Sequence, residues 1–250
     1  MSKSIGGKIA KYTFKAIGLL LVFGTIGILL WRMFSSGNPK SMKTLMVNEA
    51  TYEAWQAAEA EGRDMVMYSQ KQDEITRAEH NYGYFSVTKN LFIEDANQVQ
   101  VLFRYNNSTL RHLQEDYDLP EVPGRDEDLY DLTLYVAYDL TPLDTTDNAG
   151  NDPASVKFVR YYPSEMTSAK KNLYNYRKFV FDGVDMTVTE NPVLAVYVDI
   201  YYKDDVDYEK DAYGTLCIYD YLAEKKPYEL TGSDKDALEA FKASSETAQE

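Results

Sequence analysis

Hydrophobic and polar residues follow three different patterns along the chain, and each pattern predicts a different kind of element. The first is an uncharged apolar run from Ala16 to Trp31. As a helix it would extend about 24 Å, a little less than the ~30 Å hydrocarbon core of a membrane. Tyr12, Phe14 and Phe34 add aromatic residues of the kind that lie at membrane interfaces. We therefore predict a transmembrane anchor over residues 16–34.

A cleaved signal peptide is the main alternative to an anchor, because it also has a basic start and a short apolar stretch. The small residues Ser35-Ser36-Gly37 follow the run, but Arg32 lies just before them and makes a poor cleavage site. Lysines at positions 3, 8, 11 and 15 precede the run. This bias predicts a cytoplasmic basic tail over residues 1–15 and an extracytoplasmic C-terminal part of a single-pass membrane protein.

The second pattern has helical spacing and follows the apolar run. Asn48 is a suitable N-cap for a helix that ends near Gly62, and Tyr52 and Trp55 lie three residues apart on one face. We interpret residues 35–63 as a linker and a juxtamembrane helix. Its aromatic face is expected either to pack on the following domain or to dock a partner.

The third pattern has a period of two from Asp64 onward, which is typical of strands with one buried face. Short strands separated by turn signals predict a mainly β fold, an Ig-like antiparallel β-sandwich over residues 64–231. A C-terminal helix and polar tail are expected over 232–250. Gln98 and Gln100 alternate with the apolar positions, so we expect them at the surface, where Gln100→Asp would be nearly neutral. The predicted core includes Val101, Phe103, Leu134, Val196, Val198 and Ile200.

Charge and cysteine content narrow the class of protein. The net charge is −14, and from Met33 onward 21 Lys and Arg stand against 40 Asp and Glu, which leaves −19 on the C-terminal part. Such a domain repels nucleic acid and anionic lipid surfaces. Cys217 is the single cysteine, so an intramolecular disulfide is excluded. An exported domain on a thick-walled bacterial surface fits this composition, and a domain that stays in the cytosol is the alternative.

Catalytic and metal-binding motifs are absent from the sequence. His80 and His112 are the two histidines, and neither accompanies a nucleophile motif or a zinc-ligand spacing. We therefore expect no catalytic residue, no cofactor and no metal. The acidic segments 143–152 and 203–211 miss the EF-hand register, which leaves weaker calcium binding open. Two carboxylates that met in a cleft would instead make a wall glycan hydrolase.

Tyrosine is the compositional outlier, with 22 residues in 250. A tyrosine ring with its hydroxyl suits protein interfaces and sugar rings, although tyrosine is also a favoured strand residue. Several tyrosines alternate with the predicted core positions. If the two strands that carry them pair in the matching register, five rings form one outward patch. The ligand-binding candidates are Tyr197, Tyr201, Tyr213, Tyr219 and Tyr221.

Short sequence strings give the chain a resemblance to known proteins. They include Asn38-Pro39-Lys40-Ser41-Met42, Asn48-Glu49-Ala50 and Phe181-Asp182-Gly183, together with Arg104-Tyr105-Asn106-Asn107-Ser108-Thr109 and Glu115-Asp116-Tyr117. With the lysine-rich start and the apolar run, the layout resembles an uncharacterised group of single-pass cell-surface proteins of anaerobic Gram-positive (Clostridia-like) bacteria. The resemblance implies a location in a bacterial cell membrane and an anaerobic Gram-positive organism, and it implies no activity.

These observations favour a membrane-anchored, non-catalytic binding or scaffolding module that acts on a protein or a wall glycan. The alternative is an accessory subunit of a membrane complex for secretion or wall synthesis. Such a subunit would contact its partner through the anchor and the juxtamembrane helix.

Overall fold

The computed structural model describes residues 5–34, 37–71, 85–106, 130–140, 156–171, 174–187, 191–202, 212 and 214–247. The chain divides into two compact units, Met1–Gly37 and Asn38–Glu250. Each unit is described by itself.

The first unit is a single helix, α1 (Ile5–Phe34). Its segment Tyr12–Trp31 has a mean hydropathy of 2.1, and its side chains are exposed along the whole segment. Within the described part of the chain, this is the one helix that is long and apolar enough to cross a membrane. A membrane anchor and a signal sequence share these properties.

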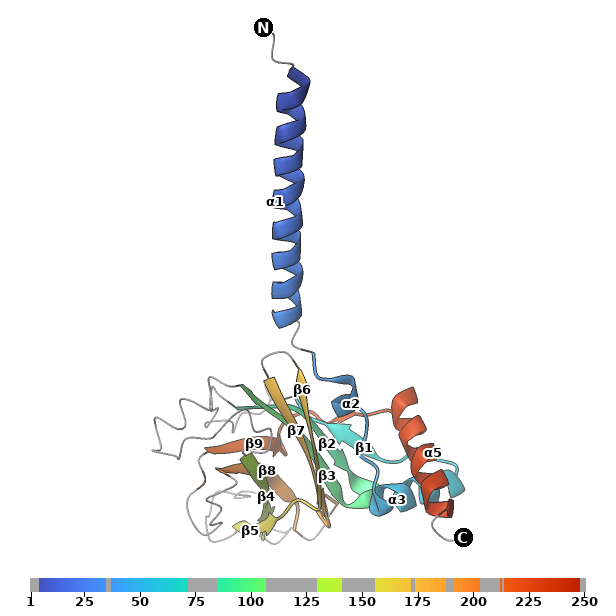
Figure 1. Cartoon of the computed structure of the whole chain (residues 1–250). Coiled ribbons are helices and arrows are strands. Elements are labelled where there is room, and N and C mark those ends of the chain that lie inside the picture. The colour runs from blue at the N-terminus through green and yellow to red at the C-terminus, as the bar shows by residue number, and fades with distance from the viewer. Residues whose placement is uncertain are drawn as a thin grey trace. The chain divides into compact units, whose positions relative to one another are not determined.

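The second unit is built on two antiparallel sheets (Figure 1). Sheet A has the strand order β10 (Lys226–Pro227), β1 (Met67–Ser69), β2 (Ser86–Ile93), β3 (Gln98–Asn106), β7 (Tyr174–Asp182) and β6 (Glu165–Lys171). Sheet B has the order β5 (Val156–Tyr161), β4 (Tyr130–Asp139), β8 (Val193–Tyr202) and β9 (Gly214–Asp220). The 3₁₀ turn η2 (Glu94–Ala96) joins β2 to β3, and Asn97 closes it in the left-handed conformation with φ 47°.

One hydrophobic core lies between the two sheets and takes side chains from both. All six core positions predicted from the period of two are buried in it, and all belong to β3, β4 or β8. Aromatic rings fill much of the remaining space. Phe85 stacks on Phe103 at 5.2 Å between ring centroids and meets Tyr130 edge-on at 4.9 Å, so rings from sheets A and B interlock.

Two β-bulges in sheet B change which residues of a strand point toward the core. One lies between Val196 and Tyr197 in the pairing of β8 with β9, and it places Tyr219 opposite Val196 rather than on the outer face. The other, in the pairing of β4 with β8, brings Val193 into the core. A bulge inserts one extra residue, so every side chain beyond it points to the other face.

Polar side chains join the two sheets at their edges. Gln70 donates to the carbonyl of Asp220 and accepts from its amide, both at 2.9 Å, while Asn90 donates to the carbonyl of Ile218 at 2.7 Å. Elsewhere, Arg177 of β7 forms an ion pair with Asp131 of β4 at 3.1 Å. Arg177 is 0% exposed, so this pair forms largely out of water and positions the sheets by directed bonds.

A helical layer covers the outer face of sheet A. It consists of α3 (Glu49–Ala60) and α5 (Gly232–Thr247), which lie on the side of sheet A away from sheet B (Figure 1). Tyr52 of α3 contacts Trp55 at 5.8 Å and Phe241 of α5 at 5.4 Å between ring centroids. Trp55 is buried with Leu238 against residues of β1 and β2. The aromatic face of α3 therefore packs on its own domain, the first of the two alternatives.

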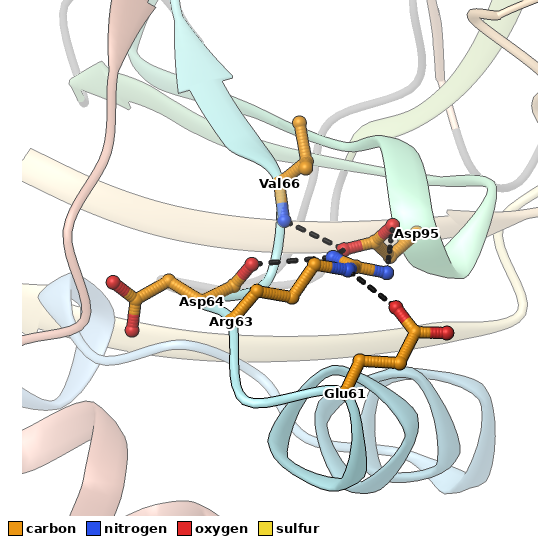
Figure 2. A network of polar contacts seen from close by, with 5 residues as sticks. All are labelled: Glu61, Arg63, Asp64, Val66 and Asp95. Carbon is orange, nitrogen blue, oxygen red and sulfur yellow. Dashed lines mark hydrogen bonds and ion pairs between the residues drawn. The ribbon is translucent and has the colours of Figure 1, made fainter.

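The C-terminal end of α3 is tied to η2 by the ion pairs in Figure 2. The Arg63 guanidinium donates to both carboxylate oxygens of Asp95, at 2.6 and 3.1 Å, and to Glu61 at 2.6 Å. Asp95 also accepts the backbone amide of Val66 at 2.7 Å. Arg63 is substantially exposed, so its ion pairs are expected to add little to the stability of the domain. We infer that they instead orient the chain where it enters β1.

A segment expected to be a linker is part of the folded unit. Residues 38–47, here called the strap, run across the outer face of sheet A and include the single-turn helix α2 (Lys40–Lys43). Met42 is 1% exposed and packs with Leu102 and Tyr176, while Leu45 is buried in the cluster beneath α3 and α5. At its end, the Asn48 side chain caps α3 as predicted, accepting from the amide of Thr51.

Side chains of the sheet and of α5 satisfy the backbone of the strap. Gln100 accepts from the amide of Met46 at 3.1 Å and donates to its carbonyl at 2.7 Å. The side-chain nitrogen of Lys178 donates to the Thr44 carbonyl at 2.6 Å, and Asp234 accepts the Leu45 amide at 2.6 Å. The backbone amides and carbonyls of the strap thus bond to side chains. In an added strand, these groups would bond to the backbone of a neighbouring strand.

The prediction that Gln98 and Gln100 face solvent is wrong. They are 0% and 1% exposed, because the strap and the start of α3 cover the face of sheet A on which they lie. Gln98 bonds to Asn48, Asp182 and Thr51, and Gln100 bonds to Gln98 as well as to the strap. The period of two identified the correct alternation, but sheet A buries both of its faces. Gln100→Asp is therefore not expected to be neutral.

We predict that Gln100→Leu lowers the free energy of unfolding by about 2–4 kcal/mol. The substitution keeps the side chain's approximate size but leaves the amide and the carbonyl of Met46 without their partner, at ~1–3 kcal/mol for each buried group. Thermal and denaturant unfolding of the full chain in detergent measures the change. Gln56→Leu is the matched control, because Gln56 is exposed on α3 and should change stability by less than about 0.5 kcal/mol. Equal losses for the two variants would contradict the role of the strap.

Candidate functional site

The outer face of sheet B carries the best candidate for a binding site. Three aromatic side chains come together there from three neighbouring strands: Tyr135 of β4, Phe158 of β5 and Tyr197 of β8. The register brings them together, since Tyr135 pairs with Tyr197 in one direction and Ala137 pairs with Phe158 in the other. All three residues alternate with core residues of their strands, so they point away from sheet A.

Together with Asp199 and Thr215, these rings line an open groove of about 300 Å³. Phe158 is 60% exposed, which is unusual for so large an apolar side chain. Small side chains lie next to the rings, where Ala137, Ala195 and Cys217 form a compact cluster against Tyr197. These small neighbours, which come from β4, β8 and β9, leave room beside the Tyr197 ring.

A polar edge borders the aromatic groove. The Thr215 hydroxyl donates to Asp199 at 2.5 Å, and the Arg160 guanidinium lies over the Tyr135 ring, 4.4 Å from its centroid. Burial raises the pKa of Asp199 above its ordinary value, although hydrogen bonds from Thr215 and Tyr201 and the charge of Arg160 oppose this. The groove thus places a carboxyl, a hydroxyl and a guanidinium beside apolar rings.

The groove offers apolar and polar contacts to a ligand. Among the described residues its lining contains one carboxyl, that of Asp199, whereas glycoside hydrolysis ordinarily uses two that flank the scissile bond. Within the described ranges, no three His, Cys, Asp or Glu side chains gather in a way that would hold a metal ion. His80, His112 and the acidic segments 143–152 and 203–211 lie outside those ranges.

The five tyrosines singled out from the sequence do not form one patch. Tyr197 lines the groove, but Tyr201, on the same strand, is 3% exposed. Tyr219 is 4% exposed in the core between the sheets, because of the bulge in the pairing of β8 with β9. Tyr221 is 44% exposed in the turn after β9, and Tyr213 lies outside the described residues. The predicted outward patch is therefore wrong for Tyr201 and Tyr219.

Sequence reasoning missed four of the groove's neighbours: Tyr135, Phe158, Arg160 and Asp199. Each alternates with inward-facing residues of its strand: Tyr135, for example, lies between Leu134 and Val136, and Asp199 lies between Val198 and Ile200. Parity assigns a face to a residue within its own strand and does not say which strands are neighbours. The β5–β4–β8–β9 order supplies that information, and the groove follows from it.

Comparison of the chain with protein-family models, with curated proteins and with solved structures gives no match. The groove, its lining and its charges are therefore the basis for a functional proposal.

Asp199→Asn is predicted to leave the melting temperature at pH 7 unchanged or to raise it. A carboxyl whose folded pKa is raised binds its proton more tightly in the folded state, so its ionisation destabilises the fold as pH rises. Asparagine retains an acceptor for Thr215 without the charge. The difference between variant and wild type should shrink as pH is lowered and Asp199 becomes protonated. A variant that is clearly less stable at pH 7 would show that the carboxylate is a structural ion.

Proposed function

We propose that this chain is a membrane-anchored, non-catalytic binding module that holds a neutral wall glycan in the aromatic groove on the outer face of sheet B. The groove formed by Tyr135, Phe158 and Tyr197 beside Asp199 is the observation that carries the proposal. A sugar ring has an apolar face of C–H groups and a rim of hydroxyls. The aromatic rings suit the first and the polar edge suits the second.

Charge supports a neutral rather than an anionic ligand. The net charge of −14 places a negative field around the domain, which opposes the approach of phosphate-rich or carboxylate-rich polymers. A protein partner would need an interface of roughly 1,000 Å² or more. Large apolar side chains exposed elsewhere on the described part of the domain, such as Leu140, Met166 and Leu222, come from separate elements and offer no obvious extension of the groove.

The location of the domain outside the cytoplasm is part of the same proposal. We infer that α1 remains uncleaved as an anchor with its N-terminus in the cytoplasm, because four lysines precede the apolar run and acidic residues first occur at Glu49. The domain then lies outside the membrane, as in the cell-surface group that the chain resembles. An Ig-like arrangement of the two sheets is part of the proposal, favoured by crossovers such as β3 to β4 and β7 to β8.

An accessory subunit of a membrane complex is the second candidate. It was expected to dock its partner through the juxtamembrane helix, but the aromatic residues of α3 are engaged with α5 and sheet A. This candidate would therefore have to rely on α1, and nothing described on α1 distinguishes it from a simple anchor.

We expect Phe158→Ser and Tyr197→Ser each to weaken glycan binding about tenfold, since a ring contact adds roughly 0.5–1.5 kcal/mol beyond its buried area. The full chain in detergent is titrated with purified peptidoglycan fragments and with neutral β-1,4-linked N-acetylglucosamine oligomers. Tyr162→Ser is the control, because Tyr162 is also exposed, at 54%, but is not part of the groove lining. Phe158→Ser and Tyr162→Ser should keep the wild-type melting temperature, whereas Tyr197→Ser should lower it, because Tyr197 also packs against Ala137, Ala195 and Cys217.

Two results would argue against this function. Wild-type protein that binds neither probe removes the glycan as ligand. Binding that all three variants lose or retain equally removes the groove as the site. Capture of a wall protein that depends on Phe158 and Tyr197 would keep the site and change the class of ligand.

For the location, protease added to wall-stripped cells should digest the C-terminal domain and leave a membrane-bound fragment that contains α1. The lysine bias of the N-terminal side is the physical reason. A cytosolic protein of the same cells serves as the control for intactness. Full protection of the domain, or a mature N-terminus near Asn38, would contradict the uncleaved, outward-facing anchor.

A further inference from the structure

We infer that the strap is a proton-operated latch, which Lys178 holds against sheet A and which releases when the amine of Lys178 is charged. The inference is independent of the ligand in the groove of sheet B. It rests on the way in which a short segment directly after α1 is bound to the domain.

The strap is held by a small number of side chains, several of which titrate. Lys178 of β7 and Lys89 of β2 donate to consecutive strap carbonyls, those of Thr44 and Lys43, at 2.6 and 3.0 Å. Asp234 of α5 accepts the amide of Leu45 at 2.6 Å. The other contacts that position the segment are the Gln100 bonds to Met46 and the buried side chains of Met42 and Leu45.

Two amines thus lie near a single carboxylate under the strap. Lys178 is 2% exposed while the strap is in place. The groups that face it are Lys89 from β2 and Asp234 from α5, while Tyr228 contacts both Lys89 and Asp234. Lys43, on the strap itself, adds a further positive charge near Lys89. With both amines protonated, this buried site holds an excess of positive charge.

The charge balance changes near neutral pH. Burial, and then the ammonium of Lys89, lower the pKa of Lys178 to about 7, although Asp234 acts in the opposite direction. For Asp234, burial is outweighed by hydrogen bonds from Thr231, Leu45 and Tyr228, so its pKa is lowered and it stays ionised. Burial also raises the pKa of Tyr228, which stays neutral. Lys178 therefore titrates within the physiological range, in contact with the strap.

Proton binding favours the released state. Once the strap lifts, water reaches Lys178 and its pKa returns toward the ordinary value of about 10.4. The open form consequently binds protons more tightly than the closed form between these two pKa values. Release therefore increases as pH falls toward 7, and the effect levels off below 7, where the amine is protonated in both forms.

Release has a geometric consequence for an anchored domain. Only residues 35–37 lie between the end of α1 and the start of the strap. Freeing the ten residues of the strap would add up to about 35 Å of extended chain to the tether. The latch would thus let acidification lengthen the reach of the domain from the membrane without unfolding the two sheets.

Hydrogen exchange of the full chain in detergent tests the latch, because the amides of Leu45 and Met46 are protected by side chains of the sheet and α5. Protection factors, corrected for the intrinsic effect of pH, are measured between pH 8.5 and 6. We expect protection in the strap to fall about 30-fold over this range, as the two pKa values of Lys178 require. Protection in β3, which carries Gln100, should change much less.

Substitutions separate a latch from a merely structural contact. Lys178→Met keeps the buried stem without the amine, so strap protection should become nearly independent of pH. Lys178→Arg keeps a charge at every pH, so protection should be low throughout. Lys157→Met, at an exposed position on β5, is the control and should behave as the wild type.

Hydrogen-exchange protection of the strap that does not depend on pH in the wild type would overturn the inference. The same pH dependence in Lys178→Met as in the wild type would also overturn it. If Lys178→Met does not fold, the Lys178→Arg and wild-type profiles still decide, because identical profiles for these two would rule out titration of Lys178.

Discussion

The strap is the constraint on which much of the second unit depends, because it makes sheet A a sheet with two buried faces. One face meets sheet B across the aromatic core. The other would expose Leu91, Ile93 and Leu102 if residues 38–47, α3 and α5 did not cover it. The strap has no strand partner, so its backbone groups must be satisfied by side chains. Gln100, Lys178 and Asp234 meet this requirement, and their burial is acceptable because each has partners.

This requirement makes the outer faces of the two sheets different. The outer face of sheet A is covered by the strap, α3 and α5. Sheet B has no described helical layer over Tyr135, Phe158 and Tyr197, and Phe158 is 60% exposed on its outer face. The anchored binding module that we propose fits this difference. The pKa of Asp199, which burial raises above its ordinary value, fits the proposed site, since carboxyls with shifted pKa values gather at functional sites.

Local chemistry accounts for the parts that sequence patterns predicted correctly. The Asn48 cap and the period of two in β3, β4 and β8 depend on neighbours within a few residues, and these determine a helix start or the buried side of a strand. The strap was missed for the opposite reason. Its Ser, Asn and Pro residues resemble a linker, whereas its partners lie 54, 134 and 189 residues further along the chain.

The sequence by itself determined an apolar helix at the N-terminus, a mainly β domain after it, an acidic surface and the identity of the central core residues. These follow from composition and from short-range periodicity, which no tertiary contact can change. Only the tertiary structure decided which tyrosines are exposed, since one inserted residue at a bulge turned Tyr219 inward. The tertiary structure also decided that Tyr135, Phe158 and Tyr197 share a groove and that Gln100 is buried. Strand order and the covering of a sheet face arise from long-range packing. The pattern of residues within one strand carries no information about such packing.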